Sequence, residues 1–426
     1  LPVDGEVLVY ADPFLLEAYV ETMLSEKDSQ AWRDLLQGPS WWIGKVRVGA
    51  LTLSGFQEAV GERKIPVLVD WHTPLDAEIE RSPQLLEVGG IPLILVQDAR
   101  HQLYGLDEKG VILWKKQLDQ RVMSDFQLVR LFDHAGEQII FNTTEQLYFI
   151  NQKGEDLPGY PKALPATASN GLRVLHFNDR QDFAYLFACT DGTLYALDRT
   201  GKALPGWNPK DSLEQVVYPV EHFQTPGKDF ILVLAADTLY VFQRDGKHRF
   251  PPMAVPGPFL QGPKYQLHAL SDRIVLCNAQ GRAEVINTEG ASFGLQLEVG
   301  NRQGVVFDFA DISGDDRKDY LVLSGKALKG YRYTGNEFKP FLNYSFPKGM
   351  DGCFALEFPN RQGGIGTYSK SGREIYLVDA EGQLVRGFPL AGDTPWFIFQ
   401  SATANAPLAV VGLGAEVYAY DLSRCF

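Results

Sequence analysis

The chain has 426 residues, of which 45% are hydrophobic and 22% are charged, which is the balance of a folded soluble protein. Its formal net charge of −13, with no run of lysines or arginines, argues against nucleic-acid binding because a phosphate backbone would be repelled. No run of about 18 apolar residues is present, so the sequence contains no candidate membrane-spanning helix.

The first 73 residues differ in pattern from the rest of the chain. Glu6–Tyr10 is predicted to be a short strand, and Asp12-Pro13 opens a predicted helix with a capping aspartate and a proline in the first turn. A second amphipathic helix is expected near Ser29–Leu36, and Lys45–Leu53 alternates like a strand. We interpret residues 1–73 as an α/β segment that ends a larger N-terminal domain.

Two adjacent tryptophans, Trp41 and Trp42, lie in this front segment after Pro39-Ser40. Paired aromatic side chains can anchor a protein partner or a sugar. More often they bury one domain against another. Trp41 and Trp42 are therefore candidate interaction residues, with a structural role as the alternative.

A repeat of about 45 residues fills the chain from residue 74 to residue 426. Each copy has a short strand with a large residue, usually tyrosine, followed by a polar turn that ends in glycine. These glycines lie at positions 110, 154, 201, 246, 290, 335 and 382, with 44 to 47 residues between neighbours, and an eighth strand, Val417–Tyr420, follows. A four-stranded blade needs about this many residues, so the repeat predicts an eight-bladed β-propeller.

The last blade lacks a fourth strand of its own. Only Arg424, Cys425 and Phe426 remain after the eighth repeat strand. We expect a strand from the N-terminal side of the propeller, Val67–Trp71 or Ala77–Arg81, to complete that blade and close the ring. In other blades the fourth strand carries motifs such as Leu157-Pro-Gly-Tyr-Pro161, and proline is tolerated only on an edge strand.

The best candidate for a metal site is the segment from Asp311 to Asp319. Its oxygen-bearing side chains Asp311, Ser313, Asp315 and Asp319 stand at positions 1, 3, 5 and 9 of a loop, as in calcium-binding loops. The glycine usual at position 6 is replaced by Asp316, which makes the tight bend harder. The alternative is a polar hairpin turn held by side-chain hydrogen bonds to its own backbone.

No other motif predicts a cofactor or a catalytic centre. The four cysteines show no metal-ligand or redox spacing, and Cys189 and Cys277 fit small buried hydrophobic positions. The seven histidines are not paired at metal-ligand spacing, and no nucleophile elbow or phosphate-binding loop is present. We therefore predict no catalytic residues and no cofactor, apart from calcium if the Asp311 loop binds it.

The repeat units, with turns of the type Leu-Tyr-x-Leu-Asp-x-x-Gly-Lys, resemble quinoprotein-type propellers. Non-catalytic members of that class include the lipoprotein propeller of the outer-membrane barrel-assembly machine. Catalytic members bind pyrroloquinoline quinone with adjacent cysteines, a stacking tryptophan and a calcium-bound carboxylate. The chain has no adjacent cysteines, and we expect its tryptophans not to repeat at the blade junctions, so this resemblance implies the fold only.

A set of motifs over residues 90–250 is similar to an uncharacterised family of large envelope proteins from Bacteroidetes-type bacteria. The set includes Gly110-Val-Ile-Leu-Trp114, Ala168-Ser-Asn170-Gly171, Ala188-Cys189-Thr-Asp191-Gly192 and Tyr218-Pro-Val220-Glu-His222-Phe223. This resemblance implies a periplasmic or envelope-associated protein with a C-terminal propeller, anchored in the membrane by a segment outside the sequence. It carries no assigned activity.

Three hypotheses about function follow. The first is a non-catalytic scaffold that binds protein partners in an envelope complex for assembly or secretion, and it is the one we favour. The second is a quinoprotein-like or glycan-acting enzyme with a site in the axial channel. The third is an adhesion module stiffened by calcium. Propellers host many functions, so the fold alone does not decide among them.

Overall fold

The fold was obtained as a computed structural model, which describes residues 7–11, 42–47, 50–55, 68–131, 136–177, 183–268, 272–299, 305–334, 337–358 and 361–425. The chain divides into two compact units, Leu1–Ile65 and Pro66–Phe426. Within these described residues every regular element is a strand, and none is a helix long and apolar enough to cross a membrane.

The first unit contains a three-stranded antiparallel sheet in the order β1 (Val7–Ala11), β2 (Trp42–Arg47) and β3 (Ala50–Gly55). The strand predicted over Glu6–Tyr10 is confirmed as β1. The single strand predicted over Lys45–Leu53 is wrong, because β2 and β3 pair with each other as neighbouring antiparallel strands. Both predicted helices lie outside the described residues.

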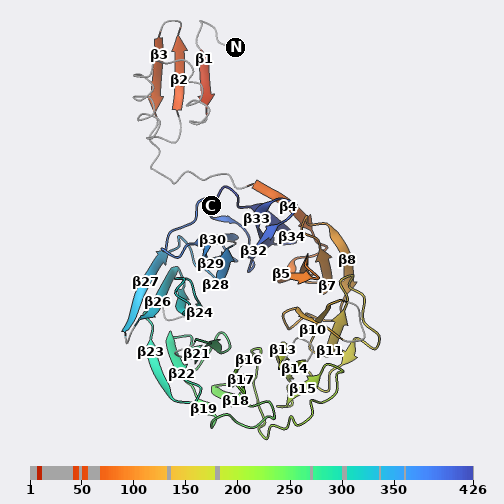
Figure 1. Cartoon of the computed structure of the whole chain (residues 1–426). Coiled ribbons are helices and arrows are strands. Elements are labelled where there is room, and N and C mark those ends of the chain that lie inside the picture. The colour runs from red at the N-terminus through yellow and green to blue at the C-terminus, as the bar shows by residue number, and fades with distance from the viewer. Residues whose placement is uncertain are drawn as a thin grey trace. The chain divides into compact units, whose positions relative to one another are not determined.

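The second unit is the predicted eight-bladed β-propeller, in which eight antiparallel sheets surround a central axis (Figure 1). In chain order the sheets are: β5 (Ile79–Val88), β6 (Ile91–Asp98), β7 (Gln102–Leu106), β8 (Ile112–Gln117); β9 (Gln127–Val129), β10 (Gln138–Asn142), β11 (Gln146–Ile150), β12 (Lys162–Ala163); β13 (Arg173–His176), β14 (Phe183–Ala188), β15 (Leu194–Asp198); β16 (Glu221–Thr225), β17 (Lys228–Ala235), β18 (Thr238–Phe242), β19 (Met253–Ala254). The other four are: β20 (Lys264–Gln266), β21 (Arg273–Cys277), β22 (Arg282–Ile286), β23 (Ser292–Gln296); β24 (Val306–Ala310), β25 (Asp319–Ser324), β26 (Ala327–Thr334), β27 (Glu337–Ser345); β28 (Gly352–Phe358), β29 (Arg361–Ser369), β30 (Glu374–Val378), β31 (Leu390–Ala391); and β32 (Phe397–Ser401), β33 (Ala406–Leu413), β34 (Glu416–Asp421), β4 (Leu68–Pro74).

The first strand of each blade is the innermost and the fourth lies at the rim. The third blade has three named strands, and at the place of its fourth a single bridge joins Leu197 and Ala203. The eight repeat strands that the sequence predicts are the third strands of the blades, from β7 to β34. The turn glycines that follow them, wherever described, have positive φ, as Gly110 and Gly154 show with values of 77°. Only glycine adopts this conformation without strain, which explains why the repeat keeps glycine there.

The strand β4 closes the ring. It pairs antiparallel with β34, with Leu68 opposite Asp421 and Pro74 opposite Glu416. The expected closure from the N-terminal side is therefore confirmed for the first of its two candidate segments, while the second begins β5. Because β4 is part of the last blade, the boundary between the two units falls after Ile65 and not after residue 73.

Neighbouring blades dock through the turn glycines at the rim. Trp71 of β4 lies over Gly110 and its indole N–H donates to the Glu108 carbonyl at 2.9 Å. Trp114 of β8 lies over Gly154 in the same way and donates to Gln152 at 2.9 Å. The expectation that tryptophans do not repeat at the junctions is thus wrong for two consecutive junctions.

The core is formed between adjacent blades, because each sheet is covered on both faces by its neighbours. All residues of the second strands β10, β14 and β25 are buried. Strands buried on both faces read as continuous apolar runs, and this is how they appear in the sequence. The innermost strands, in contrast, combine apolar residues with polar and charged ones, as in β13 and β16.

Candidate functional site

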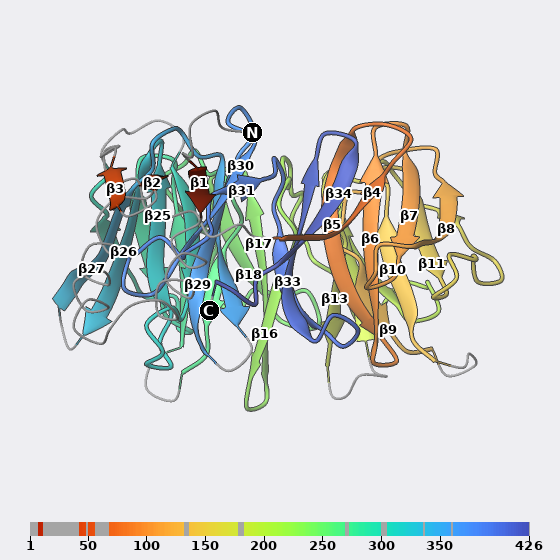
Figure 2. The same cartoon turned by 90° about the horizontal axis from the view of Figure 1, so that it is seen from above.

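Each blade presents two kinds of connection to opposite faces of the ring. Since the four strands form an antiparallel meander, the turn between strands two and three lies on the same face as the connection to the next blade. Figure 2 shows the propeller edge-on, with turns gathered at two opposite edges. We call the face with the second-to-third turns and the blade connections the connector face.

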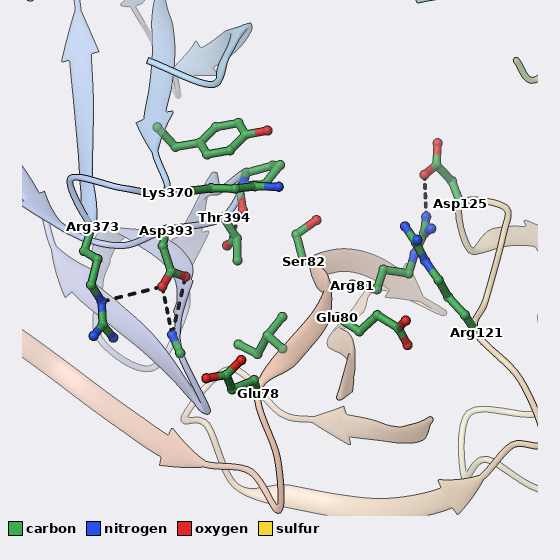
Figure 3. Close-up of a pocket in the computed structure, with 14 residues that line it drawn as sticks. Glu78, Glu80, Arg81, Ser82, Arg121, Asp125, Lys370, Arg373, Asp393 and Thr394 are labelled. Atoms are coloured by element: carbon green, nitrogen blue, oxygen red, sulfur yellow. Dashed lines mark hydrogen bonds and ion pairs between the residues drawn. The ribbon is translucent and has the colours of Figure 1, made fainter. Parts of the chain in front are cut away.

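A pocket of about 670 Å³ opens on the connector face. It is formed by blades seven, eight and one together with the connection to blade two (Figure 3). Its walls are mostly charged and polar. The lining residues are Glu78, Ile79, Glu80, Arg81, Ser82, Arg121, Asp125, Tyr368, Lys370, Arg373, Asp393, Thr394, Pro395 and Gly414.

One wall is the start of β5, the innermost strand of blade one, and this strand is irregular. Its pairing with β6 shifts register twice, between Ile79 and Arg81 and again between Arg81 and Gln84. Such irregularities bend a strand and redirect its side chains. Pro83 falls inside the second shift, where its missing N–H is tolerated. The distortion therefore determines how Arg81 and Ser82 meet the pocket.

The Arg81 side chain is held in a fixed position although it is charged. It is 15% exposed, and its Nη2 donates to Asp125 Oδ1 at 2.7 Å. Its guanidinium also lies 5.5 Å from the centre of the Phe126 ring. Burial lowers the pKa of Arg81, Asp125 opposes this, and the positive charge of Arg121 adds to the lowering. Arg81 and Arg121 are therefore close enough to repel each other, and Asp125, the ion-pair partner of Arg81, is 65% exposed.

The opposite wall is the turn between β29 and β30 of blade seven. Arg373 has a φ of 51°, an unfavourable value for a residue with a side chain. Its Nε lies 3.7 Å from Asp393 Oδ2, and Asp393 also accepts the N–H of Gly414 at 3.1 Å. Lys370 in the same turn is exposed, and in Figure 3 its side chain extends toward Ser82. No ion pair joins Lys370 to a described residue.

The acidic and the basic groups of the pocket are equally engaged in ion pairs with each other, two of four in each set. Asp125 and Asp393 have the partners given above. Glu80 Oε2 lies 3.7 Å from His101 Nε2. Glu78, Arg121 and Lys370 have no ion-pair partner within the described parts of the chain. Apart from the two ion pairs, the pocket thus holds two carboxylates, Glu78 and Glu80, and two cations, Arg121 and Lys370.

Further charged side chains line the inner strands of blades three to six. Arg173 Nη2 lies 3.4 Å from Glu221 Oε2, and Lys264 Nζ lies 3.4 Å from Asp308 Oδ1. Burial raises the pKa of Glu221, and the charge of Arg173 opposes this. Asp308 also accepts the N–H of Ala355 at 2.9 Å and so joins blades six and seven. These pairs link neighbouring inner strands.

The Asp311 loop lies on the other face of the ring, between β24 and β25, as the first turn of blade six. Asp311 accepts the backbone N–H groups of Gly314 at 2.7 Å and Asp316 at 2.8 Å. Asp319 is 1% exposed and accepts those of Ile312 at 3.0 Å and Ser313 at 2.9 Å. Burial raises the pKa of Asp319. Asp315 accepts the N–H of Arg317 at 3.0 Å. Three of the four candidate ligands thus hold the turn itself, and calcium binding stays a prediction.

The other residues selected from the sequence are separate from the pocket. Trp42 begins β2, while Trp41 lies outside the described residues. The four cysteines are unpaired and buried, which confirms the prediction for Cys189 and Cys277. Burial raises the pKa of Cys189 to about 12, so its thiol is neutral. Across the described ranges no group of three metal-capable side chains comes together.

No motif in the sequence marks a residue of the pocket as a site residue. The repeat does, however, indicate the face on which these residues lie. It assigns some of them to turns between second and third strands (Lys370, Arg373, Gly414). It assigns the others to connections between blades (Arg121, Asp125, Asp393). These positions must share one face. The two register shifts in β5 have no comparable signal apart from Pro83.

No protein-family profile matches the chain, and no curated protein matches it in sequence. Solved structures are similar in fold. BamB from Moraxella catarrhalis has a TM-score of 0.52 at 9% identity, over 83% of this chain and 99% of that one.

BBS1N, in crystals of its complex with ARL6DN, has a TM-score of 0.51 in both a lead-soaked and a mercury-soaked form. The identities are 11% and 12%, over 72% of this chain and 95% and 94% of theirs. At such identities the similarity shows the fold alone. It confirms the resemblance to the quinoprotein-type propeller at that level.

Proposed function

We propose that the chain is a non-catalytic β-propeller scaffold that binds a protein partner through its connector face. The observation that carries this proposal is the pocket, because it is formed where the repeat is locally broken. The register shifts around Arg81 and the strained backbone of Arg373 both lie in its walls. Departures from regular structure of this kind concentrate at functional sites.

The chemistry of the pocket supports binding. Its charged groups are positioned by ion pairs and by backbone hydrogen bonds, as between Asp393 and Gly414. Such groups provide specificity and orientation at protein interfaces. Of the similar structures, BBS1N was crystallised in complex with a protein, ARL6DN. The proposal that this propeller binds a protein is consistent with that example.

We further infer that the scaffold works in the bacterial cell envelope, as a subunit of an assembly or secretion complex. The support is the resemblance to the barrel-assembly lipoprotein and to envelope proteins of Bacteroidetes-type bacteria. In this proposal the protein is periplasmic or envelope-associated and is attached through a segment outside the given sequence. It needs neither a cofactor nor a metal for binding.

A quantitative affinity purification tests this function. The tagged full-length protein would be isolated from gently solubilised envelopes, and its complexes measured by native mass spectrometry and by cross-linking. We expect a stoichiometric envelope partner whose cross-links fall on the connector face. A protein that stays monomeric, without a reproducible stoichiometric partner, would overturn the proposal.

A further inference from the structure

We propose that the rim of blade five binds a second copy of this chain, by antiparallel pairing of β23 with the β23 of the other copy about a two-fold axis at Gly294. The two four-stranded sheets then form one continuous sheet. This contact goes beyond the proposed function, because it uses the rim and none of the residues that line the pocket. It follows from the unprotected edge of β23, from its outward-pointing backbone groups and from its symmetry about Gly294.

The fourth strands of the blades form the outer edges of their sheets. Such an edge presents unpaired N–H and C=O groups, and proteins usually protect it with charge, proline, bulges or a short strand. Two consecutive lysines lie in β8, while β27 contains Pro340 and a register shift, and β4 contains Pro74 and another shift. β12, β19 and β31 have two residues each, and blade three has a single bridge at this place. Among the described fourth strands, β23 is the one without such protection.

The strand β23 is long, regular and uncharged. Its five residues, Ser-Phe-Gly-Leu-Gln, include no proline and pair with β22 without a register shift. Four of the five are exposed, and the large apolar side chain of Phe293 has 47% of its surface exposed. The strand lies on the outside of the ring (Figure 1). An edge with these properties is a predicted site of pairing with another strand.

The backbone of β23 directs hydrogen-bonding groups outward at every second residue. The N–H of Leu297 donates to the Gly281 carbonyl at 2.9 Å, and this bond fixes the alternation of the ladder between β22 and β23. In an antiparallel pair, the residues in phase with such a bond face the neighbouring strand. The residues out of phase direct their N–H and C=O groups away from β22, and these are Ser292, Gly294 and Gln296.

The side chains of β23 match those of a second β23 that runs in the opposite direction. In a pair centred on Gly294, Ser292 of one copy lies opposite Gln296 of the other. Phe293 then lies opposite Leu295, on the other face of the sheet, where facing apolar side chains stabilise a strand pair. Polar residues thus face polar ones and apolar residues face apolar ones. This self-complementarity is what a two-fold contact between identical chains requires, and it identifies the second copy as the partner.

The charges beside Gly294 are also self-complementary. A Cβ at Gly294 would lie 2.6 Å from Arg282 Nη2, so this side chain covers the middle of β23. The same Nη2 lies 3.8 Å from Glu284 Oε2, a buried oxygen that accepts no hydrogen bond from the described residues. A two-fold axis at Gly294 repeats this pair in reversed order, so positive and negative groups alternate around the axis. The contact therefore brings together complementary charges.

The size of the contact predicts a weak, reversible dimer. A single pair of five-residue strands is smaller than the interfaces of stable complexes, which bury roughly 1,200–2,000 Å². The net charge of −13 on each chain opposes association, although salt at about 0.15 M screens charges that lie more than about 8 Å apart. We therefore expect a dissociation constant between about 10 and about 300 µM.

Sedimentation equilibrium of the whole chain tests this contact, from about 1 to about 500 µM protein in about 0.15 M salt. The weight-average mass is expected to rise from that of one chain toward that of two. Ser292 and Gln296 are exposed and lie opposite each other across the axis, so charges at these positions test the register. The double variants S292E/Q296E and S292K/Q296K place like charges opposite each other. Both are expected to weaken the dimer roughly tenfold.

The matched control is S292E/Q296K, which changes the same two residues. It places glutamate opposite lysine in the proposed register and is expected to dimerise at least as tightly as the wild type. S292K/Q296K makes the net charge of the chain less negative, so weaker association in this variant cannot arise from repulsion between whole molecules. Weakening in both like-charge variants together with association in S292E/Q296K is the result that supports the inference.

Three outcomes would overturn the inference. Wild-type protein that stays monomeric up to the highest concentration would do so, and the edge of β23 would then be assigned to a strand of a different protein. A dimer that all three variants form equally well would place the contact elsewhere on the chain. Weakening of S292E/Q296K to the level of the like-charge variants would exclude the antiparallel register. The affinity purification is independent of this test, because a second copy is not the envelope partner that the proposed function requires.

Discussion

The rim of the ring, where the fourth strands lie, and the pocket on the connector face are built differently. At the rim, the same contact occurs at two consecutive junctions, where Trp71 and Trp114 dock on equivalent glycines with the same hydrogen bond. In the walls of the pocket, β5 shifts register twice and Arg373 is held at a φ of 51°. A repeated contact thus joins neighbouring blades at the rim, whereas features found in single blades form two walls of the pocket.

The largest expected effect is at the rim, where Gly154→Ala tests whether the docked contact stabilises the ring. A Cβ at Gly154 would lie 2.6 Å from Trp114, and φ is 77°. We expect a loss of about 3 kcal/mol, from backbone strain and overpacking together. Gly159→Ala is the control, because its φ is 82° with nothing within 4 Å of the added Cβ. It should lose only about 1 kcal/mol.

Urea unfolding of the two variants measures this difference. Equal losses in the two variants would mean that the tryptophan contact contributes little and that backbone conformation alone keeps glycine in the repeat.

The second test concerns Arg373 in the wall of the pocket, where glycine is expected to stabilise the fold relative to alanine. Arg373→Gly and Arg373→Ala both remove the guanidinium and its contact with Asp393, and they differ only in the Cβ. Because φ at this position is 51°, the glycine variant should be more stable by about 1 kcal/mol. Thermal unfolding of both proteins checks this. An alanine variant as stable as the glycine variant would show that Arg373 is not strained.

The third test asks whether the buried pair of His222 and Asp229, outside the pocket, makes the stability of the fold depend on pH. His222 in β16 is 9% exposed and bonded to Asp229 at 3.0 Å. Burial lowers its folded-state pKa below the ordinary 6.5, although Asp229 opposes this. The unfolded chain therefore takes up the proton first, and stability falls as the pH drops from 6.5 toward the folded-state pKa.

His222→Gln should flatten this part of the pH profile. The free energy of unfolding at pH 7.5, 6.5 and 5.5 provides the comparison. A slope that persists in His222→Gln would assign the pH dependence to other groups.

The smallest expected effect concerns the Asp311 loop. Asp311 and Asp319 already accept backbone N–H groups of this turn, so we expect the melting temperature to be the same in millimolar calcium and in EDTA. A rise with calcium that disappears in Asp311→Asn would instead establish a calcium site and support the adhesion hypothesis.

The sequence was sufficient to predict the propeller because its signals are local and repeated. The turn glycine recurs in seven of the eight blades after the same kind of strand, so an imperfect copy in one blade is recognised from the others. The closing strand was predictable from the missing fourth strand. Trp71 and Trp114 were not recognised as equivalent, since the equivalence depends on which glycine of the next blade they cover.

The pocket could not be predicted in this way, because it depends on features that occur in single blades and not in the repeat. Arg81 reaches it through two register shifts, and Lys370 meets it from a blade nearly three hundred residues later in the chain. The sequence indicated the face on which these residues lie. It did not indicate which blades would leave a hollow between them.

The closure of the ring has a mechanical consequence. Leu68, where β4 begins, is opposite Asp421, where β34 ends, so tension between residues 67 and 422 acts on the same end of the paired strands. The hydrogen bonds of an antiparallel pair loaded in this way break one after another and not all together. The pairing of β4 with β34 is therefore expected to separate from this end under low force when residues 67 and 422 are pulled apart, and the ring opens there.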